Sequence, residues 1–214
     1  MTKILILGGG GMVGQKLANQ LLASSLPGHK TLDITLFDMA FPLKQDGRLS
    51  CITGSLTDAQ NITMLAQLRP DLIFHLASIV SGEAESNFDA GWQVNMFTMW
   101  HYLEAVRKLH VETGGTYVPK IIFTSSSAVF GGPFPEQIDD TFLSAPQTSY
   151  GAQKASCELL LSDFSRKGFV DGISLRLPTI CVRPGKANLA ASSFFSGIIR
   201  EPLNGQKAIL PVDE

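Results

Sequence analysis

The stretch Ile4-Leu5-Ile6-Leu7-Gly8-Gly9-Gly10-Gly11-Met12-Val13-Gly14 decides the fold of this chain. Four consecutive aliphatic residues are too few for a helix of ordinary length, so they predict a strand buried on both faces, as in a parallel sheet. The glycines predict a tight turn out of this strand, and a helix follows from Met12 to about Ala23. This strand-turn-helix order is typical of the first unit of a doubly wound α/β fold.

Three of the glycines have the spacing of a phosphate-binding turn. Gly8, Gly11 and Gly14 form G-x-x-G-x-x-G, in which missing side chains let the backbone approach a pyrophosphate and let the helix pack against the strand. The helix start, with Met12 and Val13, adds free N–H groups and the positive end of the helix dipole. Since a glycine-rich loop can also be only a turn, the motif alone leaves both interpretations open.

An acidic residue follows at the distance that dinucleotide binding requires. The second predicted strand, 33–37, ends in Asp38, 24 residues after Gly14. A carboxylate there accepts hydrogen bonds from an adenosine ribose and repels a 2′-phosphate. Because no Arg or Lys follows before Lys44, the charge pattern favours NAD over NADP. The alternative for Asp38 is a turn residue after a strand.

The bulk composition narrows the class of protein. A chain of 214 residues can bury one sizeable core, and a net charge of −2 gives no electrostatic footprint for nucleic acid or an anionic membrane. Cys51, Cys157 and Cys181 are widely spaced without C-x-x-C, so we expect neither a disulfide framework nor a metal site. The first strand follows Met1 almost at once, and no apolar run reaches the ~20 residues of a membrane span. We expect a soluble, cytoplasmic protein with a small-molecule partner.

Short β-rich runs alternate with helical patterns along the first 125 residues, which predicts βαβ units on a parallel sheet. His75, at the end of the fourth strand, has no second His or Cys at ligand spacing, so we interpret it as a core or sheet-end histidine. The expected strands are 4–7, 33–37, 49–53, 71–76, 120–124 and 172–177, and the expected helices are 12–23, 58–68, 87–108 and 150–165.

The helix expected over 87–108 carries too many apolar residues for one face, including Phe88, Trp92, Val94, Met96, Phe97, Met99, Trp100, Leu103 and Val106. Such a wide stripe implies burial on two sides, against the sheet and against a second copy of the chain. We predict a homodimer through the helices at about 87–108 and 150–165. Asn95, within the first of these helices, either braces a cofactor-lining loop or faces water.

Polar groups follow the fifth strand, and a Tyr-x-x-x-Lys pair opens the last long helix. Ser125-Ser126-Ser127 stand just beyond a carboxyl end of the sheet, where open α/β sheets carry their active sites. A spacing of four puts Tyr150 and Lys154 on the same helix face. Each residue alone has a structural interpretation, as a helix-start tyrosine and a solvated lysine.

With the glycine turn, Asp38, the serine cluster and Tyr-x-x-x-Lys in this order, the chain from Met1 to at least Gly185 resembles the extended short-chain dehydrogenase/reductase family. Matching Val129-Phe130-Gly131 to the family's Val-Tyr-Gly places the catalytic hydroxyl on Ser126. The resemblance gives Tyr150 the acid/base role and Lys154 the role of its activator, with bound NAD. It also puts near the cofactor Ser55, Leu56, Leu76, Ala77, Ser78, Asn95 and Pro178. Ser55 stands where many relatives carry Asp, so the carboxylate contact to adenine lacks its usual group.

The chemistry that the resemblance implies needs an acidified phenol. A free tyrosine has a pKa of about 10, too high for a good base near neutrality. Lowering it by ~3 units needs ~4 kcal/mol, which one ammonium ~4 Å away supplies at an effective dielectric of ~20. We therefore expect Lys154, with the positive charge of the oxidised nicotinamide added to its own, to lower the pKa of Tyr150, while Ser126 hydrogen-bonds the same substrate oxygen.

Four further segments, 80–85, 130–133, 165–172 and 191–203, resemble a subgroup of the family that oxidises a four-carbon sugar acid with NAD. A sugar acid needs a counter-charge, for which Arg183 is the first candidate and Arg200 the second, because a guanidinium can bind a carboxylate with two hydrogen bonds. Either arginine could instead form a structural ion pair. Ser192 and Ser193 are candidates for hydroxyl contacts to the substrate.

Two other functions stay open at this point. A nucleotide-sugar or uronate epimerase would keep NAD bound and return the hydride to the substrate. A dehydratase is disfavoured, because dehydratases of the family that the chain resembles usually carry an acidic pair near the serine and residues 125–128 hold no acidic residue. A non-catalytic dinucleotide sensor is the alternative from another class, and the presence of Ser126, Tyr150 and Lys154 argues against it. We predict an NAD-binding Rossmann domain over 1–180 and the start of a substrate-binding portion over 181–214, where an interrupted apolar run at 209–212 indicates that this portion is incomplete.

Overall fold

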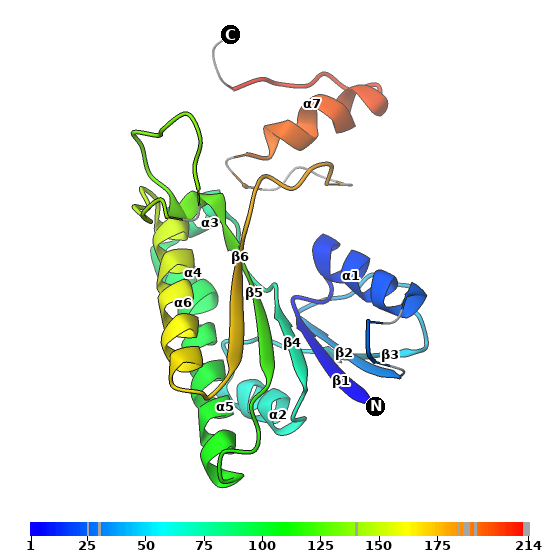
Figure 1. The fold of residues 1–214 in the computed structure, drawn as a ribbon. Helices are drawn as coiled ribbons and strands as arrows, with labels where there is room; N and C mark the ends of the chain where they lie inside the picture. Colours follow the sequence, from blue (N-terminus) through cyan, green and yellow to red (C-terminus); the bar gives the residue numbers. More distant parts are fainter. Residues whose placement is uncertain are drawn as a thin grey trace.

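The computed structural model describes residues 1–24, 26–29, 31–139, 141–183, 185, 189–190 and 192–211. Its centre is one sheet of six parallel strands in the order β3-β2-β1-β4-β5-β6 (Figure 1). The predicted doubly wound fold is confirmed, with the strand order reversing between β1 and β4. The strands are β1 (Thr2–Leu7), β2 (Leu32–Asp38), β3 (Leu49–Thr53), β4 (Leu72–His75), β5 (Lys120–Ser126) and β6 (Asp171–Leu177).

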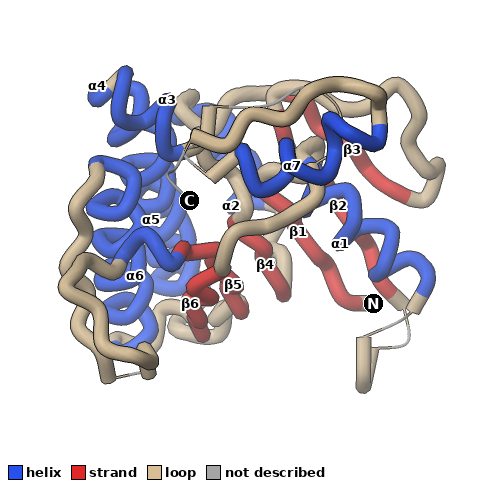
Figure 2. The backbone as a smooth tube through the Cα atoms, turned by 90° about the horizontal axis from the view of Figure 1, so that it is seen from above, coloured by secondary structure: helices blue, strands red, loops and turns tan. Residues whose placement is uncertain are grey.

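Helices cover both faces of this sheet, as the view from above shows (Figure 2). On one face, helices α2 (Ala59–Gln67), α5 (Thr98–Glu112) and α6 (Ser149–Arg166) pack on buried side chains such as Leu5, Ile73 and Ile121. On the other face, α1 (Met12–Ala23) packs on Ile4, Ile6, Ile34 and Leu36. The aliphatic run of β1 thus contributes alternate residues to both cores, which is why it has no polar position. The remaining helices are α3 (Ser81–Ser86), α4 (Phe88–Trp92), the π-helical turn η1 (Gln93–Phe97), the 3₁₀ turn η2 (Ser127–Val129) and α7 (Phe194–Leu203).

The helix expected over 87–108 differs from the observed one in two ways. It continues to Glu112, because Leu109 is also buried in the core, and it contains the π-helical turn η1. This turn holds Asn95, which is only 1% exposed and whose side chain binds the loop after β4. A π-helical turn shifts the register of a helix by one residue, and such turns gather at functional sites. Apolar periodicity alone does not reveal it.

The glycine turn is fixed by close backbone contacts. Gly8 has a φ of +86°, and a Cβ on Gly14 would lie 2.4 Å from the carbonyl oxygen of Gly8. A Cβ on Gly10 would lie 1.9 Å from the carbonyl oxygen of Ala40. By contrast, a Cβ on Gly11 would meet only the Gly8 oxygen, at 3.4 Å. Gly8, Gly10 and Gly14 are therefore required by the fold itself, whereas Gly11 leaves its free side to whatever occupies the turn.

Two further observations concern the described part of the chain. None of its helices combines the length and the hydrophobicity that crossing a bilayer requires. Cys51 and Cys181 are exposed, Cys157 is buried, and all three are free thiols.

Two tyrosines of the main core provide a matched test of the packing. The Tyr102 hydroxyl is buried in α5 with no hydrogen-bond partner among the described residues, whereas the Tyr117 hydroxyl donates to the Pro70 carbonyl at 2.9 Å. We predict that Tyr102→Phe leaves the free energy of unfolding unchanged or raises it, because an unpaired buried hydroxyl is a cost. Tyr117→Phe should lower it by about 1 kcal/mol. Urea unfolding measures both, and a larger loss for Tyr102→Phe than for Tyr117→Phe would contradict the packing described.

Candidate nucleotide and catalytic site

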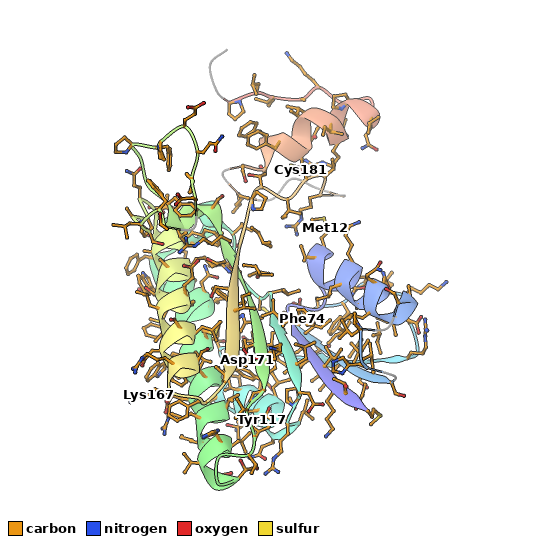
Figure 3. All side chains as sticks on the ribbon, viewed as in Figure 1. Met12, Phe74, Tyr117, Lys167, Asp171 and Cys181 are labelled. Carbon is orange, nitrogen blue, oxygen red and sulfur yellow. The ribbon has the colours of Figure 1, made fainter. Side chains whose placement is uncertain are left out.

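A cavity of about 570 Å³ lies over the carboxyl ends of the strands. Figure 3 shows Met12, at the start of α1, and Cys181, below α7, toward the upper end of the strands, with Asp171 and Tyr117 toward the lower end. This edge of a doubly wound sheet is where such folds bind ligands. The predicted site residues that line the cavity are Gly8, Gly11, Met12, Val13, Gly14, Leu76, Ser78, Ser126, Tyr150, Lys154, Pro178, Arg183, Ser192 and Ser193.

Five residues predicted near the cofactor lie outside this lining: Asp38, Ser55, Leu56, Ala77 and Asn95. Asp38 lies next to the glycine turn, where its Oδ2 accepts from the Gly10 amide at 2.9 Å and its Oδ1 from the Met39 amide at 2.7 Å. A carboxylate has about four acceptor sites, so these two bonds leave capacity for further donors.

Ser55 and Leu56 make hydrogen bonds and packing contacts within the chain itself. The Ser55 hydroxyl shares a hydrogen bond with the Thr57 hydroxyl at 2.7 Å, and its carbonyl accepts from the Asn61 side chain at 3.0 Å. Leu56 is 8% exposed and belongs to the core. The neighbouring Asp58 caps α2 by accepting from the Gln60 amide. In the chain alone, Ser55 thus stabilises its own loop, Leu56 packs in the core and Asp58 caps a helix.

Asn95 braces the loop after β4 and does not face water. Its Oδ1 accepts from the Ile79 amide at 2.9 Å and from the Ser78 hydroxyl at 3.0 Å, and its Nδ2 donates to the Gln153 Oε1 at 2.7 Å. Gln153 is fully buried. The loop that lines the cavity is thus tied through Asn95 to the helix that carries Tyr150. No sequence signal pointed to Gln153 beyond its place between Tyr150 and Lys154.

Lys154 is 2% exposed and lines the cavity. Its ammonium donates to the Thr124 carbonyl at 2.9 Å and lies 4.8 Å from the centre of the Phe123 ring. Burial lowers the pKa of Lys154 to about 8, because the charged form loses its hydration. The alternative interpretation of Lys154 as a solvated lysine is therefore wrong. His75, 1% exposed at the end of β4, is neutral, since burial and the charge of Lys154 lower its pKa to about 3.

Tyr150 lies at the start of α6, and its surroundings have opposite effects on the pKa of its phenol. Burial raises the pKa of its phenol, while hydrogen bonds from the Ser78 and Ser126 side chains act in the opposite direction, and the net shift is upward. The ammonium of Lys154 lies 5.5 Å from the centre of the Tyr150 ring and is bound to the Thr124 carbonyl. Our expectation that Lys154 lowers the pKa of Tyr150 by ~3 units is wrong for the chain by itself, because desolvation outweighs the other contributions.

A second network holds the serine cluster to α6. The buried Ser125 donates its hydroxyl to Glu158 at 2.5 Å, and Arg176 on β6 makes two-pronged hydrogen bonds to the same carboxylate. The Arg176 guanidinium also covers the Phe130 ring, 4.8 Å from its centre. Glu158 follows Lys154 by four residues and so lies on the same helix face. This network fixes the end of β5, and with it Ser126, relative to the helix that carries Tyr150.

The two arginines proposed as counter-charges have different surroundings. Arg200 is 8% exposed, donates to the Arg183 carbonyl at 2.9 Å and pairs with Glu201, so its contacts favour the alternative of a structural ion pair over substrate binding. Arg183 is exposed and lines the cavity, and its amide donates to the Ser196 hydroxyl at 3.1 Å. Ser192 and Ser193 line the same side, at the start of α7.

Several cavity residues were assigned no role in the sequence prediction. They are Val80, Ser81, Thr124, Ser125, Ser127, Ala128, Thr148, Leu177, Thr179, Ile180, Ala190 and Ser196. Thr148 caps α6 by accepting from the Gly151 amide at 3.1 Å, and since Thr is a preferred N-cap residue, its place just before the helical run is a signal present in the sequence. The others come from loops and strand ends whose contacts only the fold decides. Among the described residues, no cluster of three or more His, Cys, Asp or Glu side chains could hold a metal ion.

The chain belongs to the NAD dependent epimerase/dehydratase family, whose model matches residues 4–213. Among curated proteins, it is similar to D-erythronate dehydrogenase of Haemophilus influenzae, with 46% identity over 214 residues, and of Cupriavidus necator, with 47% identity over 218 residues. These matches cover 99% and 98% of the chain but 65% and 64% of the two relatives. The chain therefore spans about two thirds of their length.

Two solved structures agree with this placement. A structure described as a nucleoside-diphosphate-sugar epimerase, from Agrobacterium tumefaciens, has a TM-score of 0.89 and 49% identity, covering 100% of this chain and 63% of that one. A UDP-glucose 4-epimerase of Thermus thermophilus, in complex with NAD, has a TM-score of 0.80 at 20% identity over 97% of this chain and 64% of that one. The second likeness shows the fold alone.

Burial of Lys154 predicts a pH-dependent stability. The folded chain releases this proton near pH 8, and the unfolded chain near pH 10.5. Between these pH values the unfolded state binds more protons than the folded state, so the contribution of Lys154 to the free energy of unfolding rises with pH. Below pH 8 the buried lysine is charged, and its burial lowers the free energy of unfolding by about 1.4 kcal/mol for each unit of pKa difference. The free energy of unfolding of the wild type, minus that of Lys154→Met, should therefore increase from about pH 7 to about pH 10. A difference that does not change with pH would mean that Lys154 is hydrated.

Proposed function

We propose that the full-length protein oxidises a secondary alcohol of a small sugar acid, D-erythronate or a close analogue, with NAD as the acceptor. The observation that carries this proposal is the gathering of Ser126, Tyr150 and Lys154 at one cavity that also includes the glycine turn. The identity of 46–47% to two D-erythronate dehydrogenases supports the choice of substrate. Because the chain spans about 65% of those relatives, the proposal concerns the whole protein.

The described residues fit a dinucleotide. Gly11 leaves a free side at the turn, the start of α1 supplies N–H groups with Met12 and Val13, and Asp38 lies beside the turn with spare acceptor capacity for a ribose. Leu76, Ser78 and Pro178 would contact the cofactor from the other strand ends. When bound, NAD accepts a hydride. The predicted division into an NAD-binding domain over 1–180 and a substrate-binding portion from 181 remains a proposal, as does the cytoplasmic location.

Three side chains have distinct roles in the proposed reaction. Tyr150 takes the proton of the substrate hydroxyl, and Ser126 holds the same oxygen by a hydrogen bond. Lys154 holds a positive charge on the same helix face, 5.5 Å from the Tyr150 ring centre. Since the pKa of Tyr150 is raised in the chain alone, the phenolate needs a further positive charge, and an oxidised nicotinamide ring carries one. We therefore expect Tyr150 to become a better base in the complex with NAD.

The acid group of the substrate would lie on the α7 side of the cavity. Arg183 is exposed there, and Ser192 offers a hydroxyl that lines the same cavity. A guanidinium binds a carboxylate with two parallel hydrogen bonds, and a neighbouring hydroxyl adds a third contact. Arg183 is thus our candidate for the acid-binding residue.

An epimerase is the second candidate, because the relative with 49% identity and a TM-score of 0.89 is described as a nucleoside-diphosphate-sugar epimerase. An epimerase returns the hydride and accumulates no reduced cofactor. Incubation of the full-length protein with NAD and a panel of tetronates, aldonates and uronates, followed by the absorbance of reduced nicotinamide, separates the two. We expect net reduction with a tetronate. Product inversion without net reduction would support the epimerase, and dinucleotide binding without either would support a sensor.

Replacement of the proposed base gives a direct test. We predict that Tyr150→Phe in the full-length protein retains NAD affinity within about twofold and lowers kcat by about two to four orders of magnitude, because the hydroxyl proton loses its acceptor. Initial rates and a cofactor-binding titration measure the two quantities. Retained turnover would remove Tyr150 from the mechanism.

We also propose that two copies pair through the helices at 87–108 and 150–165. In the single chain, Phe97 and Trp100 are each 40% exposed and Leu159 on α6 is 74% exposed. The Trp100 ring packs edge-on against the Phe164 ring of α6, 5.9 Å away, so these helices form one apolar surface. Large apolar side chains at such a surface mark an interaction site.

Light scattering of the full-length protein tests this pairing. We predict a dimer at micromolar concentration, and a monomer for Leu159→Glu, since a carboxylate would be buried without a partner. Leu143→Glu is the matched control, because Leu143 is 81% exposed in the segment between η2 and α6. A monomeric wild type, or a Leu159→Glu variant that still dimerises, would contradict the pairing.

A further inference from the structure

Helix α3 contacts, at its two ends, two separate parts of the chain whose neighbouring residues line the cavity. Near its start, the Gly82 amide donates to the Leu189 carbonyl at 3.0 Å. Near its end, the Glu85 carboxylate accepts from the Ser149 amide at 3.0 Å. Leu189 precedes the cavity residues Ala190, Ser192 and Ser193, and Ser149 precedes Tyr150. One short helix therefore joins the proposed substrate side to the proposed catalytic helix.

The contact at Gly82 admits no side chain. A Cβ at this position would lie 2.1 Å from the Leu189 carbonyl oxygen and 3.7 Å from the Leu189 Cβ. Since real Cβ atoms do not approach a backbone oxygen so closely, any other residue would push the segment at 189–190 away from α3. Glycine is required at position 82 because the backbones of α3 and of Leu189 lie too close together for a side chain, and not because of the φ angle of Gly82.

The contact at Glu85 supports the first turn of α6. The first amides of a helix have no partner within the helix, and a carboxylate there satisfies one of them and also opposes the helix dipole. The Thr148 hydroxyl satisfies a second, that of Gly151. Ala84, between Gly82 and Glu85, is fully buried, and a Cβ on Gly91 would come within 3.2 Å of it. The helix is thus packed against α4 as well as bound at its ends.

We propose that α3 is a positioning element of the reaction, which sets the distance between the Ser192 side of the cavity and Tyr150. This inference rests on the proposed function. Gly82 acts through the segment that binds substrate, and Glu85 acts through the start of α6, so the two residues affect different steps. Neither touches the reacting atoms. Misplacement of a bound substrate by about 1 Å costs up to about 10²-fold in rate.

The kinetic test uses the full-length protein with Gly82→Ala, Glu85→Ala and Glu85→Gln, and with Gly47→Ala as the control, because a Cβ on Gly47 meets no atom within 4 Å. Gly82→Ala should raise the KM for the sugar acid by about tenfold or more with NAD affinity unchanged. Glu85→Ala should lower kcat with a smaller effect on KM. Glu85→Gln keeps an acceptor for the Ser149 amide and should restore most of the kcat. Equal effects of both Glu85 variants, or an unchanged KM in Gly82→Ala, would overturn the proposal.

Amide hydrogen exchange tests the same contact without turnover. In Gly82→Ala, peptides that cover residues 189–203 should exchange faster than in the wild type and in Gly47→Ala, because the Leu189 carbonyl has lost its tie to α3. Unchanged exchange would overturn the positioning role. If the wild type reduces no NAD with any sugar acid, the proposed function fails, and the exchange result still decides whether α3 holds this segment.

Discussion

The site depends on a buried ammonium group, that of Lys154, at the base of the cavity. A charge without water is costly unless polar groups replace its hydration, and here the Thr124 carbonyl at 2.9 Å and the face of the Phe123 ring do so. Both partners belong to β5, so the charge ties α6 to the carboxyl end of that strand. The same strand then continues to Ser126. The position of the proposed catalytic side chains thus follows from where this one charge is accommodated.

Three further ties hold α6 in place from different directions. Glu158 joins it to Ser125 and to Arg176 on β6, Gln153 joins it through Asn95 to the loop after β4, and Ser149 joins it to α3. The first tie uses a two-pronged ion pair that is partly removed from water, which makes it stronger than a fully exposed pair. Because each tie comes from a different strand or loop, the helix has a single orientation over the sheet edge.

Much of the fold could be predicted from the sequence because the relevant patterns are local. The buried run at Ile4–Leu7 and the glycines after it depend on neighbours in the chain, so β1, α1 and the doubly wound sheet were predicted. The π-helical turn around Asn95 was not, because the contacts that Asn95 makes there are to a loop 16 residues away and leave no local pattern. Likewise, the sequence left open whether Arg200 binds substrate or forms a structural ion pair, because its partners Arg183 and Glu201 are brought to it only by the folded segment. The upward pKa shift of Tyr150 in the chain alone was not predicted, since the sequence does not show how much of the phenol is buried.

The most direct measurement of the central claim is a crystal structure of the full-length protein with NAD and D-erythronate bound. We expect the reacting hydroxyl of the acid to lie at hydrogen-bond distance, about 3 Å, from both the Tyr150 hydroxyl and the Ser126 hydroxyl, with the Lys154 ammonium still bound to the Thr124 carbonyl. A bound substrate whose hydroxyls all lie away from Tyr150, or a Lys154 side chain that has left Thr124 for solvent, would contradict the proposed mechanism.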